Sequence, residues 1–202
     1  MRTLSSLACL ALVAQTATAA PGETRRQVTQ RALNVALSAA NGQGCISCHV
    51  TGQVMAAVGA AEVSGFTPNE AQANRVLQYG WDQQIGNGSI VHGGSTYPIE
   101  TSAWVAWALS YYGEDSQLDV RDQAIANLGN WLLAQRGNDG GLPPNDHNSG
   151  IISIPSRVMP TMSAARISQW LFNQTGEMRY RTGMADLGRF LAATEPAAWH
   201  ND

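Results

Sequence analysis

Apolar residues recur at helical spacing in seven separate segments of this chain, and this pattern restricts the fold more than any other feature of the sequence. Glycine, proline and asparagine interrupt the pattern between the segments, and no stretch alternates apolar and polar residues as a β-strand would. The segments cover residues 28–37, 54–63, 71–81, 104–111, 124–133, 162–172 and 184–191. The sequence therefore predicts an all-α protein of about seven helices.

The predicted helices fall into a repeated unit: one helix, a short turn containing glycine, a second helix that ends in bulky apolar residues, and a glycine-rich loop. The glycine turns lie at 64–66, 112–114 and 175–177. A unit of roughly 50 residues that contains one helix pair cannot bury its own apolar face, so neighbouring pairs must stack. We expect repeated α-helical hairpins rather than independent helices.

The best copy of the loop is Trp131-Leu-Leu-Ala-Gln135-Arg-Gly-Asn-Asp-Gly-Gly141, and it resembles the QW-type repeat of squalene and hopene cyclases. The resemblance implies a terpenoid-cyclase-like α/α-toroid, in which the aromatic residue packs at a helix end, Gln135 caps the next helix and Asp-Gly-Gly shapes the loop. Residues 79–88, with Gln83 and Gly86, resemble a degenerate copy. Leu142 replaces the tryptophan expected at the final position of the motif. The chain holds too few hairpins for a full ring, so we expect a partial toroid or arc.

Cyclase chemistry is not expected, because the acidic D-x-D-D motif of that family is absent. The nearest segment is residues 119–122, where Asp119 is expected to cap a helix and Asp122 to lie in its first turn. Kinship of fold alone does not establish function.

Cys45, Cys48 and His49 form a C-x-x-C-H sequence, which is the attachment signature of a c-type haem. The two thiols bind the two vinyl groups of the haem, and the adjoining histidine supplies an axial ligand to the iron. We therefore expect one covalent haem c. Two alternatives are a disulfide between Cys45 and Cys48, and a zinc site completed by His49 and a distant ligand. A second C-x-x-C or an H-x3-H, which would favour zinc, is absent.

The first residues read as a secretory signal peptide, which a c-type haem requires because it is attached outside the cytoplasm. A positive start is followed by a short apolar core at 7–13 and by an A-x-A cleavage site at 17–19. We expect residues 1–19 to be removed, together with Cys9, and residues 20–202 to form a single haem-bearing domain that is periplasmic or secreted. No later apolar stretch reaches the length of about 18 residues that a membrane-spanning helix needs.

The charge balance excludes nucleic acid as a partner. All 12 basic residues are arginine, and removal of Arg2 with the signal leaves 11 basic against 15 acidic residues, a net charge of −4. We expect instead a redox partner protein, with this chain as a free carrier or as a subunit of a larger complex.

The sixth ligand of the iron determines what the haem does. Met159, in a Met-Pro step like that of many class I cytochromes c, is the first candidate and is expected in the loop after residue 136; Met162 is a near alternative. His92 would give a bis-histidine haem. The remaining candidates, His147 and His200, lie in later loops, whereas Met55 is expected to pack in the core.

These features favour an exported monohaem c-type cytochrome that transfers single electrons, rather than a stand-alone enzyme. Trp104 and Trp107 share a helix face and could line the haem, although we expect them in the core. One alternative is a haem-free toroid-type binding or structural module. Another is an enzyme, with an open iron position or lyase-like chemistry, but no paired carboxylates or nucleophile with a nearby base support a lyase.

Overall fold

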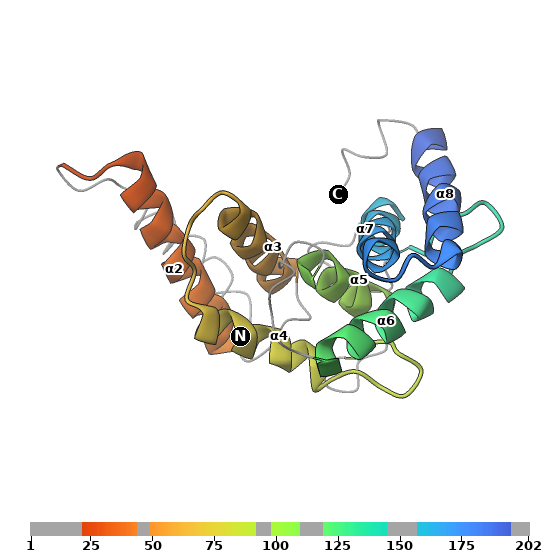
Figure 1. Cartoon of the computed structure of the whole chain (residues 1–202), viewed down its shortest axis with the longest axis horizontal. Helices are drawn as coiled ribbons and strands as arrows, with labels where there is room; N and C mark the ends of the chain where they lie inside the picture. Colours follow the sequence, from red (N-terminus) through yellow and green to blue (C-terminus); the bar gives the residue numbers. More distant parts are fainter. Residues whose placement is uncertain (1–21, 44–48, 92–97, 110–118, 145–156, 195–202) are drawn as a thin grey trace, which may run out of the picture.

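The computed structural model describes residues 22–43, 49–91, 98–109, 119–144 and 157–194 (Figure 1). The described residues form seven helices and no strand, and the only β-type pairing among them is an isolated bridge between Gln84 and Ile90. The helices are α2 (Arg25–Gln43), α3 (His49–Val63), α4 (Glu70–Trp81), α5 (Pro98–Leu109), α6 (Asp119–Ala134), α7 (Val158–Thr175) and α8 (Met178–Ala193). The prediction of an all-α fold with about seven helices is confirmed.

Each predicted segment lies within one helix or overlaps it, but most helices begin earlier than the apolar pattern does. Pro98 opens α5, where its missing N–H costs nothing and its fixed φ suits the first turn. Pro160 lies in the first turn of α7 for the same reason. The prediction that Met159 lies in a loop is therefore wrong, because Met159 is the second residue of α7.

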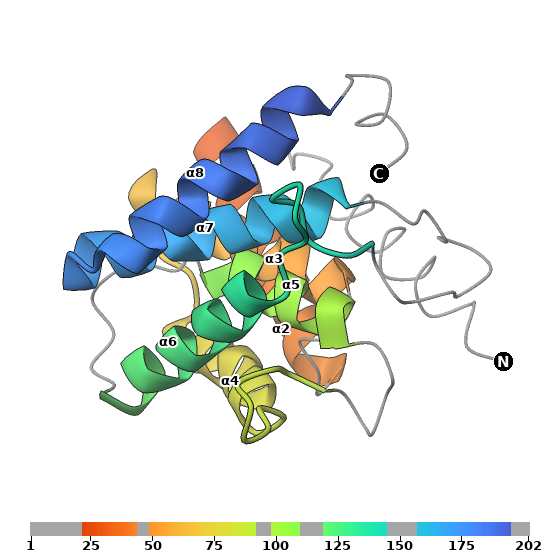
Figure 2. The same ribbon diagram turned by 90° about the vertical axis from the view of Figure 1, so that its right-hand side faces the viewer.

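The helices stack in two rows, which we call the odd row (α3, α5, α7) and the even row (α2, α4, α6, α8). In the odd row α3 packs against α5, and α5 packs against α7. In the even row α2 packs against α4, and the loop after α4 contacts α6 through Gln84, whose side-chain amide donates to the carbonyl of Ala124 (2.9 Å). Tyr180 of α8 donates a hydrogen bond to Asn130 of α6 (3.1 Å). Helices α7 and α8 run side by side (Figure 2).

The stack is open rather than closed into a ring. Figure 1 shows α2 at one end of the molecule and α8 at the other, with α5 between them. One apolar core nevertheless runs through the whole stack, with members from every helix and from two loops, including Leu37, Met55, Leu77, Val105, Leu128, Ile167 and Leu187. Met55 is fully buried, which confirms its predicted role in packing.

The loops that follow α4 and α6 repeat the same hydrogen bonds at positions that differ by 52 in residue number. The side-chain amide of Gln83 donates to the carbonyl of Tyr79 (2.5 Å), and that of Gln135 donates to the carbonyl of Trp131 (3.3 Å). The glutamine thus caps the end of its own helix, and the expectation that Gln135 caps the next helix is wrong. A glutamine four residues after a helical carbonyl reaches back to that carbonyl, one of the four left without a helical partner.

The tips of the two loops are also equivalent. Asn87 accepts a hydrogen bond from the N–H of Ser89 (2.9 Å), and Asp139 accepts one from the N–H of Gly141 (3.2 Å). The Asp-Gly-Gly segment shapes the loop, as expected. These two loops are therefore copies of one design rather than irregular connections.

Candidate functional site

The predicted haem-attachment motif lies in the connection between α2 and α3. Cys45 and Cys48 fall outside the described residues, and His49 is the first residue of α3. Of the other predicted ligands, His92, His147 and His200 also fall outside the described residues. The described structure therefore defines the surroundings of the motif rather than the motif itself.

The two ends of this connection are tied together. The buried hydroxyl of Thr51, in the first turn of α3, donates a hydrogen bond to the side-chain oxygen of Gln43, the last residue of α2 (3.0 Å). Seven residues, 44–50, lie between the two partners of this contact, and five of them, 44–48, form the connection between the helices. The connection is thus spanned by one side-chain contact.

A buried hydroxyl near the start of the helix also anchors each of the other odd-row helices to its preceding loop. Ser102 of α5 accepts a hydrogen bond from the N–H of Ile90 (2.9 Å), and Thr161 of α7 accepts one from the N–H of Leu142 (3.0 Å). All three hydroxyls lie within the first five residues of their helix and are fully buried. The connection that carries the haem motif therefore has the same place in its hairpin as the loops after α4 and α6.

Helix α5 meets α3 just beyond the motif. A Cβ atom on Gly52 would lie 3.1 Å from Cε3 of the Trp104 ring, so the backbone of α3 packs directly on this indole. Trp104 and Trp107 are only half-buried and belong to no part of the apolar core. Trp104 therefore packs between α5 and α3, as expected of an aromatic residue between helices, but both indoles are half-buried rather than fully buried.

Two polar atoms near the ends of α2 and α4 are buried without a hydrogen-bond partner among the described residues. They are Oδ1 of Asn41, four residues before Cys45, and Nε1 of Trp81. A buried polar group without a partner is costly, so such atoms often mark a bound water or ligand. Next to Asn41 the surface is open, since a Cβ on Gly42 would meet nothing within 4 Å. Open space, an unpartnered amide and a Cys-x-x-Cys-His donor set fit an attached haem.

Met159 lies farther along the stack than the sequence suggests. Its sulfur accepts a hydrogen bond from the hydroxyl of Ser163 (3.4 Å), one turn later on α7. Met159 lies in the first turn of α7, and His49 lies in the first turn of α3. Helix α5 lies between α7 and α3 (Figure 1), so one helix separates these two residues. His92, by contrast, directly follows Val91, in the loop that leads into α5.

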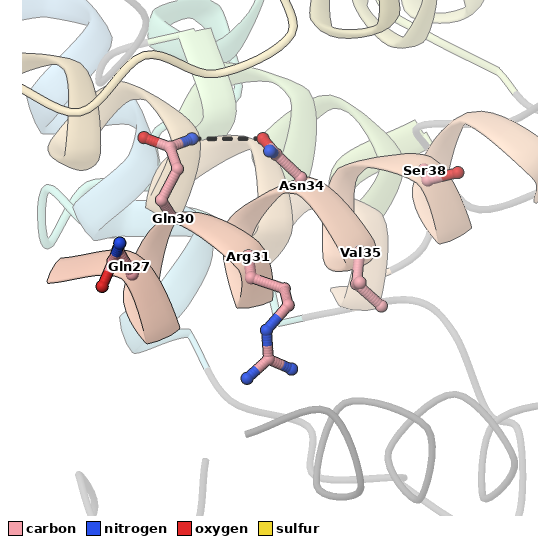
Figure 3. A pocket seen from close by; sticks show the side chains of 6 residues that line it. All are labelled: Gln27, Gln30, Arg31, Asn34, Val35 and Ser38. Atoms are coloured by element: carbon pink, nitrogen blue, oxygen red, sulfur yellow. Dashed lines mark hydrogen bonds between the residues drawn. The ribbon is translucent and has the colours of Figure 1, made fainter. Parts of the chain in front are cut away.

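Two surface pockets have no catalytic groups among their described lining residues. One, of about 410 Å³, follows the exposed side of α2 (Figure 3), where Gln30 donates to Asn34 (3.2 Å) and Arg31 is paired with Glu23 (2.8 Å). The other, of about 360 Å³, lies at the end of α6, where Arg136 and Arg189 both bind Asp186. Their charged groups form structural ion pairs.

The groups with shifted pKa values do not mark a catalytic centre either. Burial, with repulsion from Glu70, raises the pKa of Glu62, which lies at the end of α3 opposite to His49. Hydrogen bonds from Arg157 lower the pKa of Asp139 to about 2. Among the described residues no three His, Cys, Asp or Glu side chains gather into a metal site, and none of the described helices is long and apolar enough to span a bilayer.

Comparison with known proteins gives no match to this chain from protein-family models, curated proteins or solved structures. Functional inference therefore rests on the motif and on the geometry around it. The pattern of residues did not predict two parts of that geometry, the Gln43–Thr51 closure and the position of Trp104 against Gly52. The sequence signal that could have predicted the Gln43–Thr51 closure is the hydroxyl residue near the start of each odd-row helix.

Proposed function

We propose that this protein is an exported monohaem c-type cytochrome that passes single electrons to or from a redox partner protein. The observation that carries the proposal is the Cys45–Cys48–His49 motif in a connection whose ends are fixed by the Gln43–Thr51 hydrogen bond. The signal-peptide pattern of residues 1–19 supports export to the periplasm or beyond. A haem c supplies a one-electron couple at the iron.

The residues of the chain have separate tasks in this proposal. Cys45 and Cys48 would hold the haem through two thioether bonds, each formed by addition of an S–H across one vinyl group, with no net oxidation. His49, the first residue of α3, would supply a nitrogen ligand to the iron. Fixing both ends of the connection restricts the orientations that the motif can take, which favours a single haem geometry.

The order of the helices favours His92 over Met159 as sixth ligand. His92 follows Val91, whose neighbour Ile90 is hydrogen-bonded to Ser102 of α5, the helix that packs on α3. Met159 begins α7, one helix farther away. We therefore propose His92 as the sixth ligand and Met159 as the alternative, the reverse of the order that the sequence suggests.

The scaffold supports a relationship to the QW-type repeat proteins, which we propose as its origin. Support comes from the Asp-Gly-Gly turn, in which Asp139 accepts a hydrogen bond from the N–H of Gly141, and from the repeat of the loop 52 residues apart. The glutamine contact, made within its own helix, departs from the pattern of that family. The relationship concerns the fold, and we propose no cyclase activity.

The test of haem attachment is the mass and absorbance of the protein after export in a host that matures c-type cytochromes. We expect a red protein whose mass after denaturation includes one haem. Cys45→Ala with Cys48→Ala should abolish covalent attachment, whereas Ser47→Ala, inside the same motif, should leave it intact. A colourless protein with a Cys45–Cys48 disulfide, or with bound zinc, would contradict the proposal.

The sixth ligand is tested by replacing the two candidates separately. We expect His92→Ala to change the low-spin absorbance spectrum and Met159→Leu to leave it unchanged. The opposite result would restore Met159, and its thioether would raise the reduction potential above that of a bis-histidine haem. A spectrum that neither change affects would contradict both assignments.

A further inference from the structure

Three residues form a half-buried stripe along α5, which apart from Pro98 at its start is otherwise buried. Glu100, Trp104 and Trp107 are spaced by four and three residues, so they lie on one side of α5. These three are half-buried, whereas the residues at 99, 101–103, 105, 106, 108 and 109 are all buried. Two large indole rings are thus held at a surface that the described residues leave partly open.

The first of these rings adjoins the start of α3. Trp104 packs against the backbone of Gly52, where an added Cβ would lie 3.1 Å from Cε3 and 3.2 Å from the Cβ of Trp104. His49 precedes Gly52 by three residues, and positions three apart lie on the same side of a helix, about 4.5 Å apart along its axis. The contact between α3 and α5 therefore lies one turn from the proposed haem ligand.

Trp107 differs from Trp104 in its neighbours. The guanidinium of Arg166, on α7, lies over the Trp107 ring at 5.2 Å from the centroid. This contact turns the second indole toward α7, whereas Gly52 holds the first against α3. The two rings therefore point to different neighbours along the odd row.

We propose that the indole of Trp104 forms an apolar wall of the haem site, in contact with the haem held by His49. This inference rests on the proposed function. A haem is a large apolar ring that needs apolar neighbours, and an aromatic ring of fixed orientation provides them at low entropic cost. The absence of a side chain at Gly52 is what lets the indole approach the first turn of α3.

The proposal is tested by NMR of the indole N–H signals in holoprotein labelled at tryptophan, after denaturation and mass measurement have shown that haem is attached. The chain has six tryptophans: Trp81, Trp104, Trp107, Trp131, Trp170 and Trp199. Pseudocontact shifts from a low-spin ferric iron fall with the cube of distance and vanish on reduction. We expect a larger redox-dependent shift, or paramagnetic broadening, for Trp104 than for Trp107, Trp131 and Trp170.

Signals are assigned by single Trp→Phe variants, with Trp107→Phe as the matched control on the same face of α5. If Trp104→Phe does not fold, the Trp104 signal is the one that all five other variants retain. A Trp104 shift no larger than that of Trp131 would overturn this proposal while leaving haem attachment intact. Absence of haem in the mass measurement would instead overturn the proposed function.

Discussion

Gly88 and Gly140 are the residues on which the repeated loop depends most. Both have positive φ (93° and 89°), and a Cβ would lie 2.8 Å from the carbonyl carbon of Asn127 in the first case and 2.9 Å from that of Asp186 in the second. Each glycine therefore lets its loop touch the backbone of the next even-row helix. No other residue type fits without moving main chain.

An unfavourable φ alone costs about 1–3 kcal/mol. We predict that Gly88→Ala lowers the free energy of unfolding by more than this, because the new Cβ would also clash with the backbone of α6. Gly86→Ala is the control: it lies two residues away in the same loop, has no positive φ and meets nothing within 4 Å. It should change stability by less than about 0.5 kcal/mol. Equal losses in denaturant titrations would contradict the proposed loop contact.

Asp139 gives the structure a specific dependence on pH. Arg157 donates two hydrogen bonds to this carboxylate (2.6 and 2.8 Å) and lowers its pKa from 3.8 to about 2. A pKa lower in the folded state stabilises the protein above the unfolded value, and that stabilisation is lost as pH falls from about 4 to about 2.

We predict that Asp139→Asn lowers the thermal midpoint by a constant amount above about pH 5, and that the difference from the native protein shrinks below about pH 4. Asparagine keeps the loop contact, since Asn87 makes it in the neighbouring copy. Melting curves recorded across this pH range test the prediction. A difference that stays constant down to about pH 2.5 would show that the ion pair adds nothing.

Single residues were predictable from the sequence where their chemistry is local. Met55 is buried as its helical spacing suggested, and Gly65 and Gly176 adopt the positive φ expected of turn glycines. The place of Trp104 was not predictable, because its close contact with α3 depends on a glycine, Gly52, lying opposite to it. Apolar character does not distinguish a core position from an exposed face.

At the scale of the helices, the buried hydroxyls that anchor the odd row should differ in importance. The hydroxyl of Thr161 accepts the hydrogen bond of the N–H of Leu142, which is fully buried. The hydroxyl of Thr51 donates instead to the side chain of Gln43, which is exposed. Removing the first hydroxyl leaves a buried N–H without its partner. Removing the second leaves an amide that water can reach.

We predict that Thr161→Val lowers the free energy of unfolding by about 1–3 kcal/mol, the cost of an unsatisfied buried donor. Thr51→Val, the same change at the equivalent position of α3, should cost less, about 0.5–1.5 kcal/mol. Chemical denaturation of both variants measures the difference. If Thr51→Val proved the more costly change, its hydroxyl would have a further role in the connection between α2 and α3.

The helices themselves were predictable because their apolar faces are periodic, but their starts were not. The first turns of α5 and α7 contain Pro98 and Pro160, which the periodic pattern excludes and helix geometry accepts. The Met159-Pro160 step was therefore assigned to a loop. Helix starts depend on backbone groups that lack helical partners, and side-chain hydrophobicity does not report these groups.

For the whole molecule, the sequence indicated stacked hairpins but not their alternation between two rows. The alternation depends on contacts between residues that are far apart in the sequence. Gln84 donates to the carbonyl of Ala124, and Arg136 donates to Asp186. Such contacts join loops to the next hairpin and leave no periodic pattern. The position of the connection between α2 and α3 within the stack could be known only once both rows were placed.

An open stack predicts a gradient of local stability, because each hairpin is supported only by its neighbours. Helix α5 is packed between α3 and α7 and also touches α6, whereas α2, at one end, packs on α3 and α4. We predict that native-state hydrogen exchange is slowest for amides of α5 and at least about tenfold faster for those of α2, which corresponds to about 1.4 kcal/mol of local stability.

If covalent haem joins the end of α2 to α3, protection should rise in the last turn of α2 relative to the Cys45→Ala and Cys48→Ala double variant, and little in α8. Uniform protection across all seven helices would show instead that the shared core makes the stack one cooperative unit.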